Sequence, residues 1–101
     1  MRVINWKSIR LIIDNKIKQK LTDRNLTTDD VLEMLNGDIL LDHIEKGHGI
    51  FHKYILLVEW KSKIFLIALS FEDTNTFYLL TVYNKLSKSY IKKYQTWKDG
   101  L

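Results

Sequence analysis

Cysteine and proline are both missing from this sequence of 101 residues, and glycine occurs only four times. The lack of cysteine excludes a disulfide framework and thiolate metal sites, and it fits a reducing compartment. The scarcity of proline and glycine argues against flexible linkers. We therefore expect a single domain over residues 1–101.

Long apolar runs are missing as well. No run approaches the roughly 18 residues that cross a bilayer, and the run Leu11-Ile12-Ile13 is too short for the core of a secretory signal. The sequence also has no Gly-rich phosphate loop. We therefore predict a cytoplasmic protein with no membrane segment and no cofactor.

Positive charge is concentrated at the two ends of the chain, although the net charge is only +4. Residues 1–26 carry seven Lys and Arg against two Asp, and residues 85–101 carry five Lys against one Asp. The stretch 27–84 is acidic, with four Lys against nine Asp and Glu. If the two ends meet in space, they form a positive face that suits nucleic acid or an acidic protein partner. The alternative is an ordinary solvated surface of Lys-rich helices.

Helical periodicity dominates the N-terminal segment and predicts a first helix over residues 5–22. Its apolar positions recur at steps of three and four and are Trp6, Ile9, Ile13, Ile17 and Leu21. Lys16, Lys20 and Arg24 follow one another at four-residue spacing and form a basic ridge. This ridge either binds an anionic partner or keeps one side of the helix solvated.

A second, shorter helix is predicted over residues 28–35. Thr27 and Asp30 have the spacing of a capping box, in which each side chain accepts a hydrogen bond from the other residue's backbone. Gly37 follows the last apolar position and is suited to a left-handed conformation at the end of the helix.

Four strands are predicted over residues 38–43, 50–60, 64–69 and 77–83, because these runs are rich in apolar β-formers. Short polar gaps join them in series, which predicts an antiparallel sheet. The apolar residues are nearly consecutive, so we expect both faces to be covered, one by helices and the other by a partner or the C-terminal segment. The fold class is α+β, with two N-terminal helices, a four-stranded antiparallel sheet and a C-terminal helix.

The C-terminal helix follows Ser87, which is a possible N-cap residue. Its apolar positions are Tyr90, Ile91, Tyr94 and Trp97, with several lysines between them. This mixture has two interpretations. The aromatic side chains either stack on nucleic acid bases beside lysine–phosphate contacts, or they dock the helix on the sheet.

Proton-transfer chemistry is the most plausible chemistry in this sequence. His43, His48 and His52 fall within ten residues, but no metal-binding motif connects them, so we expect no metal site. His52 begins a predicted strand and is a candidate general acid or base for RNA. Tyr83 ends the last strand and could orient the nucleophile or stack on a base. The alternative for each histidine is an ordinary surface residue.

A family resemblance adds to this interpretation. The positions that carry it are Lys16, Lys20, Arg24-Asn25-Leu26-Thr27, Asp30-Val31, Leu35-Asn36-Gly37-Asp38-Ile39, Tyr54-Ile55-Leu56 and Leu80-Thr81-Val82-Tyr83. With the order of elements, they resemble the RelE/BrnT-like superfamily of small ribonuclease toxins. Relatives tend to show His, Arg and Arg in the first helix; here Lys16 and Lys20 replace the first two, and Arg24 is retained.

The resemblance implies a metal-independent ribonuclease of a toxin–antitoxin system. Lys16, Lys20 and Arg24 would bind the RNA substrate, and His52 and Tyr83 would be the catalytic residues. A cognate antitoxin or another protein partner, and possible homodimer formation, are part of this hypothesis. Two alternatives are open: a non-enzymatic antitoxin, immunity or inhibitor module that binds a protein, and a nucleic-acid-binding module without cleavage.

Overall fold

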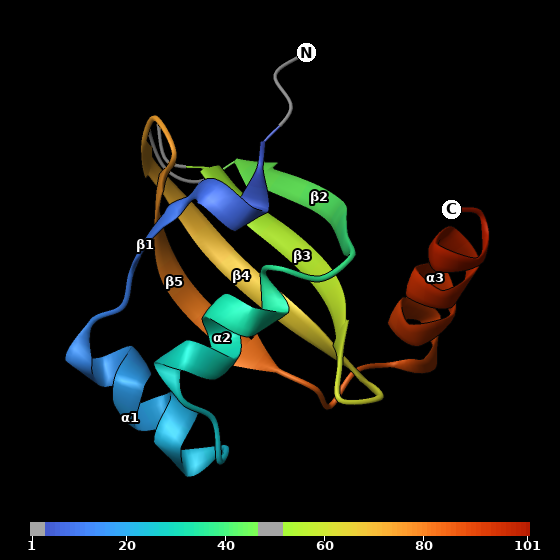
Figure 1. The fold of residues 1–101 in the computed structure, drawn as a ribbon, viewed down its shortest axis with the longest axis horizontal. Helices are drawn as coiled ribbons and strands as arrows, with labels where there is room; N and C mark the ends of the chain where they lie inside the picture. Colours follow the sequence, from blue (N-terminus) through green and yellow to red (C-terminus); the bar gives the residue numbers. More distant parts are fainter. Residues whose placement is uncertain (1–3, 47–51) are drawn as a thin grey trace.

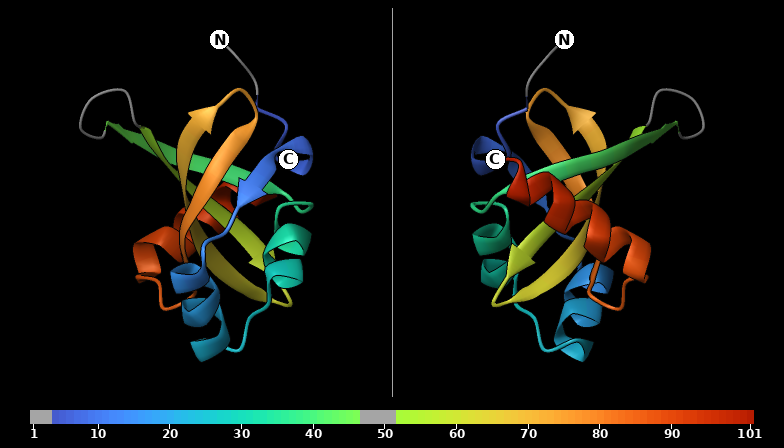
Figure 2. Two further views of the ribbon diagram at one scale, coloured as in Figure 1. Left: turned by 90° about the vertical axis from the view of Figure 1, so that its left-hand side faces the viewer. Right: turned by 90° about the vertical axis from the view of Figure 1, so that its right-hand side faces the viewer.

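A twisted five-stranded sheet forms the centre of the structure, with helical segments on both of its faces (Figures 1 and 2). The computed structural model describes residues 4–46 and 52–101. Its elements are the 3-10 turn η1 (Trp6–Ser8), β1 (Arg10–Ile12), α1 (Asn15–Asp23), α2 (Thr28–Met34), β2 (Ile39–Lys46), β3 (His52–Trp60), β4 (Lys63–Asp73), β5 (Thr76–Tyr83) and α3 (Lys88–Asp99). The strand order is β1-β5-β4-β3-β2. None of the helices in these described ranges is long and apolar enough to cross a membrane.

The predicted first helix is wrong over its N-terminal half. In place of a helix over residues 5–22, the chain forms η1, then β1, and only then α1. β1 runs parallel to β5, with Leu11 opposite Phe77. The Asp14 carboxylate then accepts a hydrogen bond from the Ile17 backbone N–H at 2.9 Å and begins α1. The apolar steps of three and four thus came from separate elements that pack against the same core.

The sheet therefore has five strands and not the predicted four, and it is mixed because β1 is parallel. The neighbours β2 to β5 are antiparallel, as predicted. Strand β2 continues to Lys46, into the predicted loop, and β4 continues to Asp73. The predicted beginning of a strand at residues 50–51 lies outside the described residues.

Helix α2 confirms the predicted capping box. The Thr27 hydroxyl accepts a hydrogen bond from the Asp30 backbone N–H at 3.1 Å, and the Asp30 carboxylate accepts one from the Thr27 N–H at 2.9 Å. Gly37, by contrast, does not adopt the predicted left-handed conformation. A Cβ at Gly37 would lie 3.4 Å from Val58 Cγ2, which is an ordinary van der Waals contact, so the space beside β3 would admit an alanine.

The strands bury side chains on both faces of the sheet. The core on the side of α1 and α2 contains Leu56, Val58, Phe65, Ile67, Leu69, Phe77, Leu79 and Val82. The core on the side of α3 contains Ile55, Leu57, Ile64, Leu66, Ala68 and Tyr94. Both faces are thus covered, and the C-terminal helix covers the second one (Figure 2).

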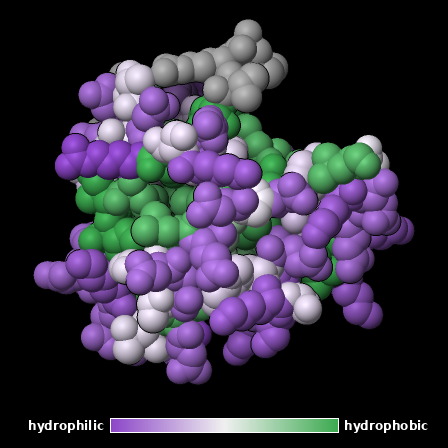
Figure 3. Space-filling model, viewed as in Figure 1, coloured by the Kyte–Doolittle hydropathy of each residue, from purple (hydrophilic) through white to green (hydrophobic). Residues whose placement is uncertain are grey.

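The first face keeps some apolar surface beside β1 (Figure 3). Ile9, Leu11 and Ile13 are half-buried there and pack against the core. Polar side chains cover much of the rest of this view.

Helix α3 packs its aromatic side on the sheet, which confirms the docking interpretation of this segment. Tyr94 is 1% exposed, and its hydroxyl donates to the Asp38 carbonyl at 2.7 Å. Burial raises the pKa of the Tyr94 phenol above its usual value. Lys98 donates to the Glu59 carboxylate at 2.5 Å. Ser87 occupies the N-cap position, but its side chain makes no capping hydrogen bond.

The hairpin between β3 and β4 closes through two residues in the left-handed region. Lys61 has φ 49° and Ser62 has φ 66°, as the central residues of a type I′ turn require. Glycine and asparagine are the residues that tolerate this region best, and other side chains cost about 1 to 2 kcal/mol there. The turn is therefore a strained part of the fold.

Ser62→Gly should raise the free energy of unfolding by about 1 kcal/mol, because glycine adopts a positive φ without steric cost. Urea denaturation at constant pH measures this change. Ser89→Gly, in the first turn of α3, is the control and should not raise stability, because glycine is a poorer helix former than serine. A destabilised S62G protein would contradict the assignment of strain to this turn.

Candidate nucleic-acid interface

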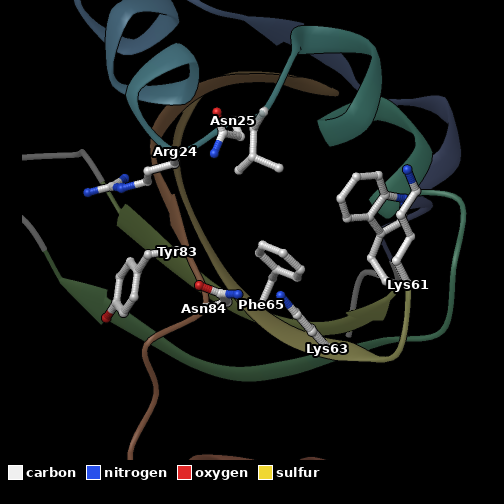
Figure 4. A pocket seen from close by; sticks show the side chains of 9 residues that line it. Arg24, Asn25, Lys61, Lys63, Phe65, Tyr83 and Asn84 are labelled. Carbon is white, nitrogen blue, oxygen red and sulfur yellow. The ribbon is translucent and has the colours of Figure 1, made fainter.

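A hollow lies where the α1–α2 connection, the β3–β4 turn and the end of β5 meet (Figure 4). Its volume is about 340 Å³. We call it the basic pocket, and its lining residues are Arg24, Asn25, Leu26, Trp60, Lys61, Lys63, Phe65, Tyr83 and Asn84. Segments far apart in the sequence thus form one cavity.

Cations dominate the charge of the basic pocket. Arg24, Lys61 and Lys63 contribute positive charge, and none of the described residues that line it is acidic. Cations on several elements around one cavity concentrate positive potential, since a low-dielectric wall focuses the field. The pocket is therefore suited to an anionic ligand.

The end of helix α1 fixes the position of Arg24 and Asn25. The Leu26 backbone N–H donates to the Leu21 carbonyl at 2.8 Å and the Asn25 N–H donates to the Thr22 carbonyl at 3.0 Å. This pattern is a Schellman motif, and Asn25 takes its left-handed position with φ 59°. The helix exit therefore turns sharply toward the sheet.

Arg24 joins this helix end to strand β5. Its Nη1 donates to the Val82 carbonyl at 2.8 Å and lies 3.3 Å from Thr81 Oγ1. A guanidinium group has five N–H donors, so these contacts leave donors for a ligand. Arg24 therefore has a structural role at the edge of β5 and a position in the pocket.

Aromatic rings form another part of the lining. The rings of Trp60 and Phe65 lie edge to face, with centroids 5.7 Å apart and an interplanar angle of 71°. The Lys61 ammonium lies 4.6 Å from the centroid of the Trp60 ring, within cation–π range. Figure 4 shows Tyr83 across the hollow from Lys61. Cations and rings together provide the two kinds of contact that single-stranded nucleic acids need.

The structure brings together only two of the five predicted site residues. Arg24 and Tyr83 both line the basic pocket. Lys16 and Lys20 are exposed on α1 and are not among the described residues that line it. The ridge predicted from their spacing thus meets the pocket only at Arg24.

His52 lies near the other end of the sheet from Tyr83. The strand register places Tyr83 opposite Leu66, and Leu66 opposite Leu57, which is five residues along β3 from His52. At about 3.3 Å per residue, these positions are separated by about 17 Å along the strand direction. The two predicted catalytic residues therefore do not share one site.

Several pocket residues were not predicted from the sequence. Lys61 and Lys63 fall in the polar gap between two predicted strands, and Trp60 and Phe65 fall within those strands. A signal was present, because two lysines and two aromatic residues flank one tight hairpin turn. Their position next to Arg24 depends on the pairing of distant strands.

A second cavity lies on the α3 face of the sheet and shares Tyr83 with the basic pocket. Its volume is about 230 Å³. We call it the His43 cavity, and its lining residues are His43, Glu45, Lys53, Ile55, Leu66, Ala68, Thr81, Tyr83 and Tyr90. His43, and not His52, is thus the histidine that lies in one cavity with Tyr83.

A β-bulge places His43 and Asp42 on the α3 face. The pairing of β2 with β3 shifts between Leu41 and His43, and a bulge lets two successive residues share one face. The Asp42 side chain is only 5% exposed and forms an ion pair with Lys93 of α3. Asp42 Oδ2 lies 2.5 Å from His43 Nδ1, so a nearly buried carboxylate orients the imidazole.

The His43 ring lies between two carboxylates. Its Nε2 lies 2.9 Å from Glu45 Oε1, and hydrogen bonding to Glu45 and Asp42 raises the pKa of His43. Hydrogen bonding from His43 in turn lowers the pKa of Glu45. Burial acts to raise the pKa of Asp42, but hydrogen bonds from Lys93 and His43 outweigh it and lower that pKa. The imidazolium form of His43 is therefore favoured.

His48 lies outside the described residues. Within residues 4–46 and 52–101, no group of three His, Cys, Asp or Glu side chains could hold a metal ion.

Comparison with known proteins gives no relative: no family model, no curated protein and no solved structure matches this chain. The RelE/BrnT-like resemblance therefore stays a prediction. The basic pocket and the His43 cavity are the features from which a function can be inferred.

The His43 contacts predict a specific pH dependence of stability. The imidazolium stabilises the fold below the unfolded histidine pKa of 6.5, and this contribution is lost as the pH rises through the raised folded pKa. Asp42 and Glu45, with lowered pKa values, contribute above their unfolded values of 3.8 and 4.5, and this is lost as the pH falls. The contacts are thus strongest between about pH 4.5 and 6.5.

The difference in Tm between the wild-type protein and His43→Gln should accordingly be largest in that window and smaller at about pH 9. Differential scanning fluorimetry across the pH range measures it. A difference that stays constant or grows above neutral pH would show that the imidazolium does not stabilise the fold.

Proposed function

We propose that this protein binds single-stranded RNA at the basic pocket. The observation that carries the proposal is that Arg24, Lys61 and Lys63 line one cavity together with the half-buried rings of Trp60 and Tyr83. Cations contact phosphates, and aromatic rings stack on bases whatever their sequence.

Metal-independent RNA cleavage is the second candidate function, and the sharing of Tyr83 between the two cavities favours it. In such a reaction the 2′-oxygen attacks phosphorus and the P–O5′ bond breaks. One group accepts the 2′-hydroxyl proton, and another protonates the leaving 5′-oxygen. The His43 imidazolium could donate the second proton, and Lys53, which lines the same cavity, could stabilise the phosphorane charge. Together these features favour cleavage by a toxin-type ribonuclease, and a cognate antitoxin as its partner is part of the same proposal.

Removing two cations of the pocket should weaken RNA binding. The double variant Lys61→Ala, Lys63→Ala should lower the affinity for a single-stranded oligoribonucleotide and reduce the slope of log affinity against log salt by about 1.4. Fluorescence anisotropy at several salt concentrations measures both quantities. The matched control is Lys88→Ala, Lys92→Ala, which removes two exposed lysines from α3.

Equal losses in the two double variants would contradict binding at the pocket, because they would report only net charge. If the wild-type protein bound no RNA even at low salt, the proposed function would be wrong. The protein-binding alternative would then be favoured.

Cleavage should depend on Tyr83 and not on a metal. Wild-type protein should cut single-stranded RNA in the presence of EDTA, and Tyr83→Phe should slow the reaction by about 100-fold or more if its hydroxyl takes part in proton transfer. Electrophoresis of end-labelled RNA measures the rate. Expression of the protein without its partner should arrest growth; harmless expression together with intact RNA would favour an antitoxin, immunity or inhibitor module.

A further inference from the structure

Tyr83 is a lining residue of both the basic pocket and the His43 cavity. It lies at the end of β5, opposite Leu66 of β4, and Leu66 is also part of the lining of the His43 cavity. The two cavities are therefore adjacent, and a ligand that extends beyond the basic pocket across Tyr83 reaches the second cavity.

The His43 cavity has the chemical groups of a second phosphate-binding position. His43 and Lys53 supply positive charge, and Thr81, Tyr83 and Tyr90 supply hydroxyl groups. Its apolar floor comes from Ile55, Leu66 and Ala68 of the central strands. A few polar groups that converge over an apolar floor are typical of ligand sites.

We propose that a single RNA strand occupies both cavities, with one nucleotide in the basic pocket and a phosphate further along the same strand at His43 and Lys53. This inference rests on the proposed RNA-binding function and deepens it. It assigns the ligand class as an oligonucleotide of several nucleotides, which crosses Tyr83, and not as a mononucleotide or free phosphate.

Glu45 competes with this phosphate. Its carboxylate lies 2.9 Å from His43 Nε2 and 3.7 Å from Lys53 Nζ. The side chains of Glu45 and Lys53 are 50% and 47% exposed, so both can move without disturbing the core. Ion pairs between such exposed groups contribute little, and a phosphate with two charge-assisted contacts can replace the carboxylate. Asp42, in contrast, is nearly buried and stays paired with Lys93.

The test compares two ligands and two variants of opposite expected effect. The ligands are uridine monophosphate and a hexamer of 2′-O-methyl uridine, which lacks the attacking hydroxyl and stays intact. Lys53→Ala should weaken binding of the hexamer several-fold, and Glu45→Gln should strengthen it several-fold. Neither change should alter binding of the mononucleotide. Glu33→Gln on α2 is the control for Glu45→Gln, since it removes an equal charge from an exposed position outside both cavities.

Isothermal titration calorimetry at fixed salt and pH measures these affinities, and circular dichroism checks the fold of each variant. Hexamer binding that is unchanged in both Lys53→Ala and Glu45→Gln would overturn the two-cavity inference and leave RNA binding at the basic pocket standing. Equal effects of Glu45→Gln and Glu33→Gln would overturn it as well. A wild-type protein that binds neither ligand would overturn the proposed function itself.

Discussion

The central constraint on this structure is the burial of both faces of strands β3 and β4. Successive side chains of β3 enter opposite cores, as Leu56 and Leu57 do, because side chains alternate along a strand. Each face then needs its own cover, which α1, α2 and η1 provide on one side and α3 on the other. Apolar side chains fill both faces in the middle of the sheet. Polar side chains that could contact a ligand therefore lie at strand ends, in turns and on the part of the α3 face beside the helix.

Both proposed ligand cavities follow from this constraint. The basic pocket lies beyond the end of the covered sheet, where the β3–β4 turn and the exit of α1 converge. Arg24 fixes that convergence, because its guanidinium group donates to the Val82 carbonyl at the edge of β5. The His43 cavity lies on the α3 face, and its lining includes His43, Ala68 and Tyr90. Tyr83 belongs to both cavities because it ends the strand on which they meet.

Much of the fold could be predicted from local signals, and most of the site could not. The capping box at Thr27 and the hairpin runs are local, so they were predicted correctly. The predicted helix over residues 5–22 was wrong over its N-terminal half, because apolar residues at steps of three and four occur both in one helix and in several short elements that pack on one core. The prediction also did not use Asp14 as an N-cap, which is where α1 begins. The sequence predicted His52 as the partner of Tyr83, but the strand register sets these two residues far apart. His43 lies in a cavity with Tyr83 because of the bulge at Asp42, and no sequence pattern reveals that bulge.

The most direct test of this account is a map of the RNA-binding surface on ¹⁵N-labelled protein by NMR. Titration with an uncleavable single-stranded oligoribonucleotide should shift the signals of Trp60, Lys61, Lys63, Tyr83 and Asn84 most strongly. Backbone signals of Arg10 and Leu11 in β1, which pair with Thr76 and Phe77 at the other end of β5 from Tyr83, should stay unchanged. Shifts confined to the exposed ridge of Lys16 and Lys20, or no shifts at low salt, would contradict the claim that RNA binds where the β3–β4 turn meets the end of β5.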